Sequence, residues 1–181
     1  MKKILVLTGS YNKHGNTSKM ADAFIKGAEA AGHQVKRFDT AFMNLHDCKG
    51  CNACWSNGHA CAHPDDFNQI EPYLESCDSL VIISPMYWFH WTANIQMIID
   101  KLYAYGGAGG DRPLAIKDSM FMICGADTSD EYGPVQDAYK MISKYCKWND
   151  KGILTCGGFY GDHKIEDSDV LAKAEAMGRN L

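Results

Sequence analysis

The sequence predicts an α/β domain with a doubly wound, mostly parallel five-stranded sheet in the order 2-1-3-4-5 and helices on both faces. Short apolar runs alternate with helical patterns along the chain, which is typical of successive βα units. Parallel neighbours need right-handed crossovers, so helices have to cover both faces of the sheet. Five such units are too few for a (β/α)8 barrel, so the sheet is expected to be open.

Each expected strand is a short run of apolar side chains bounded by polar residues or glycine. Gly32 should end the first helix as a left-handed cap, and Asp167, Ser168 and Asp169 should cap the first turn of the last helix. The strands are expected at 3–8, 34–39, 79–84, 120–124 and 152–157. The helices are expected at about 17–31, 65–76, 93–105, 134–148 and 167–180.

The composition predicts one compact domain spanning 1–181, with a cysteine-rich insertion at about 46–64. Of the 181 residues, 46% are apolar, which is enough for a buried core. A net charge of −4 argues against nucleic acid as a partner. The first apolar run, 4–7, is too short for a signal sequence or a membrane span. A cytoplasmic protein is therefore expected, and in a reducing compartment clustered cysteines bind metal or do redox chemistry more often than they form disulfides.

The loop between the first strand and the first helix, 9–18, has the composition of an anion site. Free amides at a helix start and the helix dipole favour a phosphate. The glycine spacing matches neither a Walker loop nor G-x-G-x-x-G, so nucleotide hydrolysis and a Rossmann fingerprint are disfavoured. A well-capped turn is the alternative interpretation. Four neutral side chains can add donors to the site: Ser10, Asn16, Thr17 and Ser18.

Aromatic side chains crowd the loop after the third strand, where βα turns usually carry Gly, Asp or Ser. In the 2-1-3-4-5 order this loop and the anion loop flank the switch point, where such sheets bind ligands. Tyr87 and Trp88 can stack on a flat ring, and the main chain of 85–88 can bond to its polar rim. Trp88, Phe89 and Trp91 are equally explained as core or dimer-interface residues.

The loop after the fourth strand reaches the same edge of the sheet. Gly125 can direct a backbone amide, and Asp127 a carboxylate, at the polar end of a bound ring. Amides there would stabilise negative charge on the ring. Asp127 is equally explained as a turn or helix-capping residue.

The densest chemical signal is a group of four cysteines with gaps of two, two and six residues. Bacterial ferredoxins use C-x2-C-x2-C to surround one iron-sulfur cubane and take the fourth ligand from elsewhere. Here the last cysteine of the group can supply it. Zinc, recruiting His59 or His63, is one alternative, and free or redox-active thiols are another, because spacing shows capacity and not occupancy. The group is Cys48, Cys51, Cys54 and Cys61. The other cysteines are expected in the core: Cys77, Cys124, Cys146 and Cys156.

Three segments, 9–17, 84–88 and 96–101, make the sequence similar to the NADPH-dependent FMN reductase and flavodoxin-like superfamily. This resemblance implies a flavodoxin-like fold, bound FMN, and homodimers or homotetramers. The cysteine group resembles the compact motif of iron-sulfur flavoproteins within the superfamily, which implies a [4Fe-4S] cluster on its four thiols. For the FMN phosphate the resemblance implies Ser10, Asn12, Asn16, Thr17 and Ser18. For the FMN ring it implies Pro85, Met86, Tyr87 and Trp88.

These patterns together predict an FMN-dependent oxidoreductase in which the flavin carries the chemistry and no catalytic side chain is needed. Electrons are expected to pass between FMN and a [4Fe-4S] cluster, with a ferredoxin-like protein or a small molecule as redox partner. Two alternatives stay open: an NAD(P)H-dependent FMN, quinone or azo-compound reductase without a cluster, and a non-enzymatic flavodoxin-like electron carrier. The sequence shows no specific nicotinamide-binding motif, so NAD(P)H as donor rests on the resemblance alone.

Overall fold

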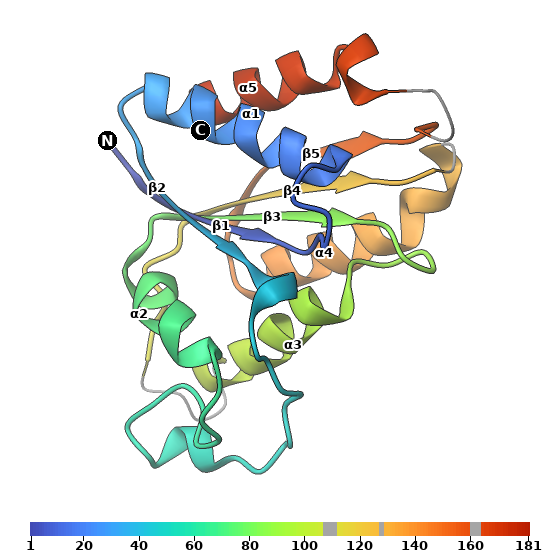
Figure 1. The fold of residues 1–181 in the computed structure, drawn as a ribbon. Helices are drawn as coiled ribbons and strands as arrows, with labels where there is room; N and C mark the ends of the chain where they lie inside the picture. The colour runs from blue at the N-terminus through green and yellow to red at the C-terminus, as the bar shows by residue number, and fades with distance from the viewer. Residues whose placement is uncertain (107–111, 127–128, 160–163) are drawn as a thin grey trace.

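The computed structural model describes residues 1–106, 112–126, 129–159 and 164–181. Its five strands form one sheet in the order β2-β1-β3-β4-β5, with every neighbouring pair parallel, which confirms the predicted topology (Figure 1). The inner strands are buried along nearly their whole length, as expected for a sheet covered on both faces. The strands are β1 (Lys3–Thr8), β2 (Gln34–Asp39), β3 (Ser79–Pro85), β4 (Asp118–Cys124) and β5 (Asn149–Cys156).

Two helices pack on one face of the sheet and three on the other, and the alternation of strand side chains divides the core between them. Ile4 and Val6 of β1 join the core under α1 and α5, above the sheet in Figure 1. Leu5 and Leu7 point the opposite way and join the core under α2, α3 and α4. The helices are α1 (Asn16–Ala30), α2 (Phe67–Ser76), α3 (Ala93–Lys101), α4 (Gly133–Tyr145) and α5 (Val170–Arg179).

The predicted end of α4 at 148 is wrong. The helix ends at Tyr145, and Lys147 takes a left-handed φ of 58° that turns the chain back. The Trp148 amide then donates to the Ser143 carbonyl (2.9 Å), and the Trp148 side chain is buried in the core. The chain therefore enters β5 at Asn149, earlier than the apolar pattern indicated.

The predicted start of the last helix at 167 is also wrong. Asp167 closes a short 3-10 turn (Ile165–Asp167), and α5 begins at Val170. Asp169 occupies the N-cap position without a side-chain cap bond, whereas Ser168 Oγ accepts from the Val170 amide (3.3 Å). The prediction for Gly32 is confirmed: its φ is +84°, and its amide bonds to the Glu29 carbonyl (2.9 Å).

Helices α1 and α5 meet through two glycines whose backbones are in contact. A Cβ at Gly27 would lie 1.9 Å from the Glu175 carbonyl oxygen, and one at Gly178 would lie 2.1 Å from that of Phe24. Both distances are far inside van der Waals contact, and the obstructing atoms belong to the backbone. The helix pair can therefore pack this closely only with glycine at these positions.

We predict that Gly178→Ala lowers the free energy of unfolding by about 1–3 kcal/mol, because the added methyl group overpacks the contact between α1 and α5. Urea denaturation measures the change. Gly133→Ala is the matched control, since a Cβ there meets no atom within 4 Å at the start of α4. Equal losses in the two variants would contradict the assigned role of the helix contact.

Candidate functional site

Three loops leave the carboxyl edge of the sheet side by side, after β1, β3 and β4. Backbone hydrogen bonds tie the start of each loop to the neighbouring strand. The Gly9 amide donates to the Ile83 carbonyl (3.0 Å), and the Met86 amide donates to the Cys124 carbonyl (2.8 Å). The Gly125 amide likewise bonds to β5 (3.0 Å). The structure therefore brings the three predicted ligand loops to one edge.

The start of α1 has the free amides of an anion site. Gly15, at the N-cap, makes no side-chain cap bond, and the first turn carries no acidic side chain. The first amide bonded to the N-cap carbonyl is that of Lys19 (3.0 Å), so the first-turn amides before it have no partner in the helix. With Thr17 buried at this end, the helix offers N–H groups and a hydroxyl to a negatively charged ligand.

Several of the predicted donors hold the loop itself together. The Asn12 carbonyl accepts from the Gly15 amide (3.1 Å) and from Ser18 Oγ (2.9 Å). Ser10 Oγ accepts from the Asn12 amide (3.1 Å). In this structure Ser10 and Ser18 therefore shape the loop, while Asn16 and Thr17 stand at the open helix end.

Sequence analysis missed Thr92, which lies between the anion loop and the aromatic loop. A Cβ at Gly9 would lie 2.3 Å from Thr92 Oγ1, so β1 and the start of α3 approach closely here. The Thr92 amide donates to Ser84 Oγ (3.1 Å). Thr92 Oγ1 is buried and has no hydrogen-bond partner in the described part of the chain. A single threonine before a helix is typical of an ordinary N-cap, so the sequence alone did not indicate a buried hydroxyl without a hydrogen-bond partner.

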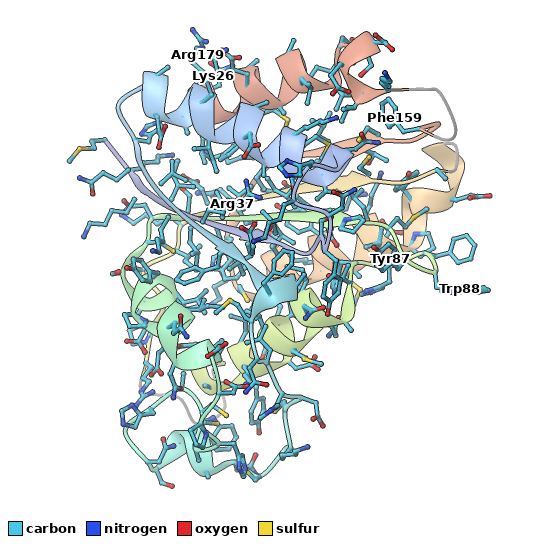
Figure 2. All side chains as sticks on the ribbon, viewed as in Figure 1. Lys26, Arg37, Tyr87, Trp88, Phe159 and Arg179 are labelled. Carbon is cyan, nitrogen blue, oxygen red and sulfur yellow. The ribbon has the colours of Figure 1, made fainter. Side chains whose placement is uncertain are left out.

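The aromatic loop is a tight turn closed by Tyr87 and His90, whose backbones exchange hydrogen bonds of 2.9 and 3.1 Å. Trp88 (φ 47°) and Phe89 (φ 64°) are both left-handed, in positions that usually take Asn or Gly. Figure 2 shows Trp88 projecting from the outer end of the loop, with 93% of its surface exposed. Core placement is therefore wrong for Trp88 and Phe89. It is right for Trp91, which is buried and donates Nε1–H to Gln96 Oε1 (2.7 Å).

The third loop gives less to a ligand than predicted. A Cβ at Gly125 would lie 2.6 Å from the Tyr132 hydroxyl and 3.3 Å from Met86 Cβ. Glycine is therefore required here for packing beneath the edge, and its amide, predicted to reach the polar end of a bound ring, already donates to the Cys156 carbonyl (3.0 Å). Asp127 lies outside the described residues, so its predicted role stays a prediction.

The four grouped cysteines line one small cavity of about 20 Å³, in the segment between β2 and α2. This segment is the loop at the bottom of Figure 1, and the end of α3 closes the cavity through Lys101, Tyr103 and Ala104. Cys51 Sγ lies 3.5 Å from His63 Nε2. The lining cysteines are Cys48, Cys51, Cys54 and Cys61.

The four cysteines line the same cavity, but they do not form a metal site. All eight cysteines are free, and no three His, Cys, Asp or Glu side chains of the described residues gather closely enough to hold an ion. Burial raises the pKa of the Cys54 thiol, and the neighbouring thiols raise it further. His59 lies on an adjoining cavity, so of the two histidines named as zinc ligands only His63 shares the thiol cavity.

The other cysteines are placed as predicted, with one exception. Cys77, Cys124 and Cys156 are buried, whereas Cys146 is half-buried at the end of α4. Burial raises the pKa of the Cys77 thiol to about 12.

Comparison with known proteins gives consistent matches. Residues 2–149 match the family model described as NADPH-dependent FMN reductase. An iron-sulfur flavoprotein of Archaeoglobus fulgidus is 34% identical over 106 residues, which is 59% of this chain and 47% of that protein. The chain thus spans about half the length of the iron-sulfur flavoproteins it matches.

Two further proteins match over almost the whole chain. A Bacillus subtilis protein named as an NAD(P)H-dependent FMN-containing oxidoreductase is 20% identical over 180 residues, covering 97% of this chain and 96% of that protein. The structure of an NAD(P)H:quinone oxidoreductase from Methanothermobacter marburgensis superposes with a TM-score of 0.74 at 19% identity, covering 99% of this chain and 96% of that one. This superposition confirms the flavodoxin-like fold.

Within the part of the chain that the structure describes, no helix is long and apolar enough to cross a bilayer.

We predict that alkylation separates the two kinds of cysteine in the metal-free, reduced protein. Iodoacetamide at about pH 8 should label Cys51 first, because its thiol is exposed, and should leave Cys77 unlabelled until the protein unfolds. Mass spectrometry of peptides from a labelling time course measures both rates. Labelling of Cys77 as fast as Cys51 would contradict the placement of these residues.

Proposed function

The chain belongs to the NADPH-dependent FMN reductase family, and we propose that it is an FMN-dependent oxidoreductase coupling FMN to a [4Fe-4S] cluster held in the same chain. When bound, these groups supply two-electron and one-electron chemistry respectively, so the protein has to bind, orient and insulate them. The observation that carries the proposal is the joint occurrence of an open helix start, an aromatic loop beside it and four thiols on one cavity wall.

The carboxyl edge fits FMN by its chemistry. The free first-turn amides of α1 and the side chains of Asn16 and Thr17 suit the phosphate. The orphan hydroxyl of Thr92 lies between the two loops and needs a polar partner. Pro85, Met86, Tyr87 and Trp88 suit the ring through side-chain and aromatic contact, since the amides of Met86 and Tyr87 are already bonded within the protein. Ser10, Asn12 and Ser18 hold the phosphate loop in shape, and Gly125 keeps the neighbouring loop close.

The cysteine cavity fits a cluster by donor type and number. Cys48, Cys51, Cys54 and Cys61 line one cavity, and none of their thiols forms a disulfide. The name of the archaeal relative supports the same assignment. The thiols would have to gather more closely than in this structure, which the loop character of the segment permits.

We also propose the domain organisation, location, assembly and redox partner of the protein. Residues 1–181 would form one domain, acting in the cytoplasm as a homodimer or homotetramer. The exposed side chains of Tyr87, Trp88 and Phe89 suit contact with a second copy or with a redox partner. A ferredoxin-like protein or a small electron acceptor would complete the reaction.

A second candidate function is an NAD(P)H-dependent FMN, quinone or azo-compound reductase that uses FMN without a cluster. The absence of a gathered metal-ligand group among the described residues favours it. Absorbance spectra of protein purified without oxygen, before and after dithionite, separate the two functions. Flavin bands together with broad iron-sulfur absorbance support the first function, and flavin bands alone support the second.

We predict that Asn16→Asp weakens FMN binding at least about tenfold, because a carboxylate in the first turn of α1 repels the phosphate while suiting the helix dipole. Titration of the apoprotein followed by flavin fluorescence measures the dissociation constant. Asn68→Asp is the matched control, since Asn68 is an exposed residue in the first turn of α2. Unchanged affinity in Asn16→Asp would place the phosphate elsewhere.

We predict that Cys51→Ala abolishes the cluster and spares the flavin, because the cavity then offers only three thiolates. Iron and sulfide analysis and the flavin content of the same anaerobic sample measure both cofactors. Cys146→Ala, a half-buried cysteine outside the group, should leave both unchanged. Loss of both cofactors, or of neither, in Cys51→Ala would contradict the division between the two sites.

A further inference from the structure

We propose that Lys101 is a positioning residue for the four grouped cysteines and acts through a buried ion pair with Asp65. This inference rests on the proposed cysteine site, and it concerns how the protein orders that site before any metal enters. Neither residue touches the proposed flavin crevice, so the two halves of the proposed function can be tested separately.

The ion pair is almost completely removed from water. Only 3% of the Lys101 side chain and 1% of the Asp65 side chain are exposed, and Lys101 Nζ contacts Asp65 Oδ2 directly. The ammonium also lies 5.1 Å from the centre of the Phe67 ring. A buried charge without its partner is strongly unfavourable, so each residue fixes the place of the other.

Asp65 connects the two ends of the cysteine-rich segment. Its Oδ2 accepts from the His46 amide (2.8 Å), and its Oδ1 accepts from the Phe67 amide (2.9 Å). Burial by itself would raise the pKa of Asp65, but the hydrogen bonds from Lys101 and these two amides lower it, so the carboxyl stays ionised. One carboxylate therefore closes the segment 46–64 into a loop.

The next residue adds a second tie at the same place. The Asp66 amide donates to the Asn44 carbonyl (3.0 Å), and Asp66 Oδ2 accepts from the Asn44 amide (2.7 Å). These bonds pair the entering and leaving chains with each other. They do not fix them to the rest of the protein, whereas Lys101 does so from the last residue of α3.

Lys101 also faces the cavity that the thiols line. Of the two lysines among the described residues on this wall, Lys49 is half exposed and pairs with Asp47 (2.9 Å), and Lys101 is buried. Lys101 therefore joins the buried ion pair directly to the residues that line the cysteine cavity.

Hydrogen exchange on the metal-free, reduced full chain tests the positioning role. We expect Lys101→Met to speed amide exchange in 46–64 at least about tenfold, with β1, β3 and β4 unchanged. Lys101→Arg keeps the charge and should restore protection. Asp118→Asn is the matched control, because it breaks ion pairs with Lys2 (2.7 Å) and Lys151 (3.4 Å) at the start of β4, outside the segment. Wild-type exchange of 46–64 in Lys101→Met would overturn the proposal.

A double variant covers the case in which Lys101→Met fails to fold. Lys101→Met combined with Asp65→Asn carries no buried charge and keeps an oxygen acceptor for one of the two backbone amides. We expect it to fold and still to exchange faster than wild type in 46–64. Protection equal to wild type would mean that the ion pair does not order the segment, and would overturn the proposal.

Binding of Co²⁺ to the reduced protein, followed by sulfur-to-cobalt charge-transfer absorbance, links the ordering to the thiols. We expect about tenfold weaker binding in Lys101→Met, recovery in Lys101→Arg, and wild-type affinity in Asp118→Asn. Equal affinity in wild type and Lys101→Met would overturn the role of Lys101 at the thiols. A wild-type protein without charge-transfer absorbance would instead contradict the proposed cysteine site, while the exchange experiment still decides whether Lys101 orders the segment.

Discussion

The close approach between the end of β1 and the start of α3 is the constraint on which the carboxyl edge of the sheet depends. Gly9 leaves no room for a side chain, because a Cβ would meet Thr92 Oγ1 at 2.3 Å. Since β1 and β3 are neighbours at the switch point of the sheet, the loops that follow them both start at this contact. The anion loop and the aromatic loop therefore start side by side at this edge, and neither can move away without separating Gly9 from Thr92.

Helix α3 connects this edge of the sheet to the cysteine cavity. Its first turn follows the aromatic loop, and its last residue, Lys101, lies on the cavity wall. With 9 residues the helix is about 14 Å long, so one rigid element separates the two candidate sites. Side-chain hydrogen bonds run along the helix, from Trp91 just before it to Gln96 (2.7 Å) and from Gln96 to Asp100 (2.6 Å). The long crossover between β2 and β3 can therefore hold the cysteines without disturbing the loops at the carboxyl edge.

The sequence was sufficient for the sheet, because a buried parallel strand needs a continuous apolar run and each run here lies between clear turn residues. It was insufficient where one long-range contact overrides a local pattern. Trp148 follows the helical pattern of α4 directly in the sequence, yet the left-handed Lys147 sends it into the core from a turn. Thr92 and the pair of Lys101 with Asp65 were missed for the same reason, since the residues they contact, Gly9 for Thr92, lie far away in the chain and no sequence spacing indicates these contacts. The grouping of the thiols on one wall, in contrast, follows from local spacing and was predictable.

The turn at Trp88 and Phe89 shows that the aromatic loop is shaped for contact and not for its own stability. Two bulky residues in the left-handed region are unfavourable, by about 1 kcal/mol or more each, and Asn or Gly would relieve the strain. Their side chains recover little of this by burial, since 93% of Trp88 and 47% of Phe89 remain exposed. Covering these rings with a flat ligand or a second copy of the chain would remove apolar surface from water and offset the strain. A bound state would therefore give the strained turn a physical reason, and the proposed flavin and the proposed homo-oligomer would each provide one.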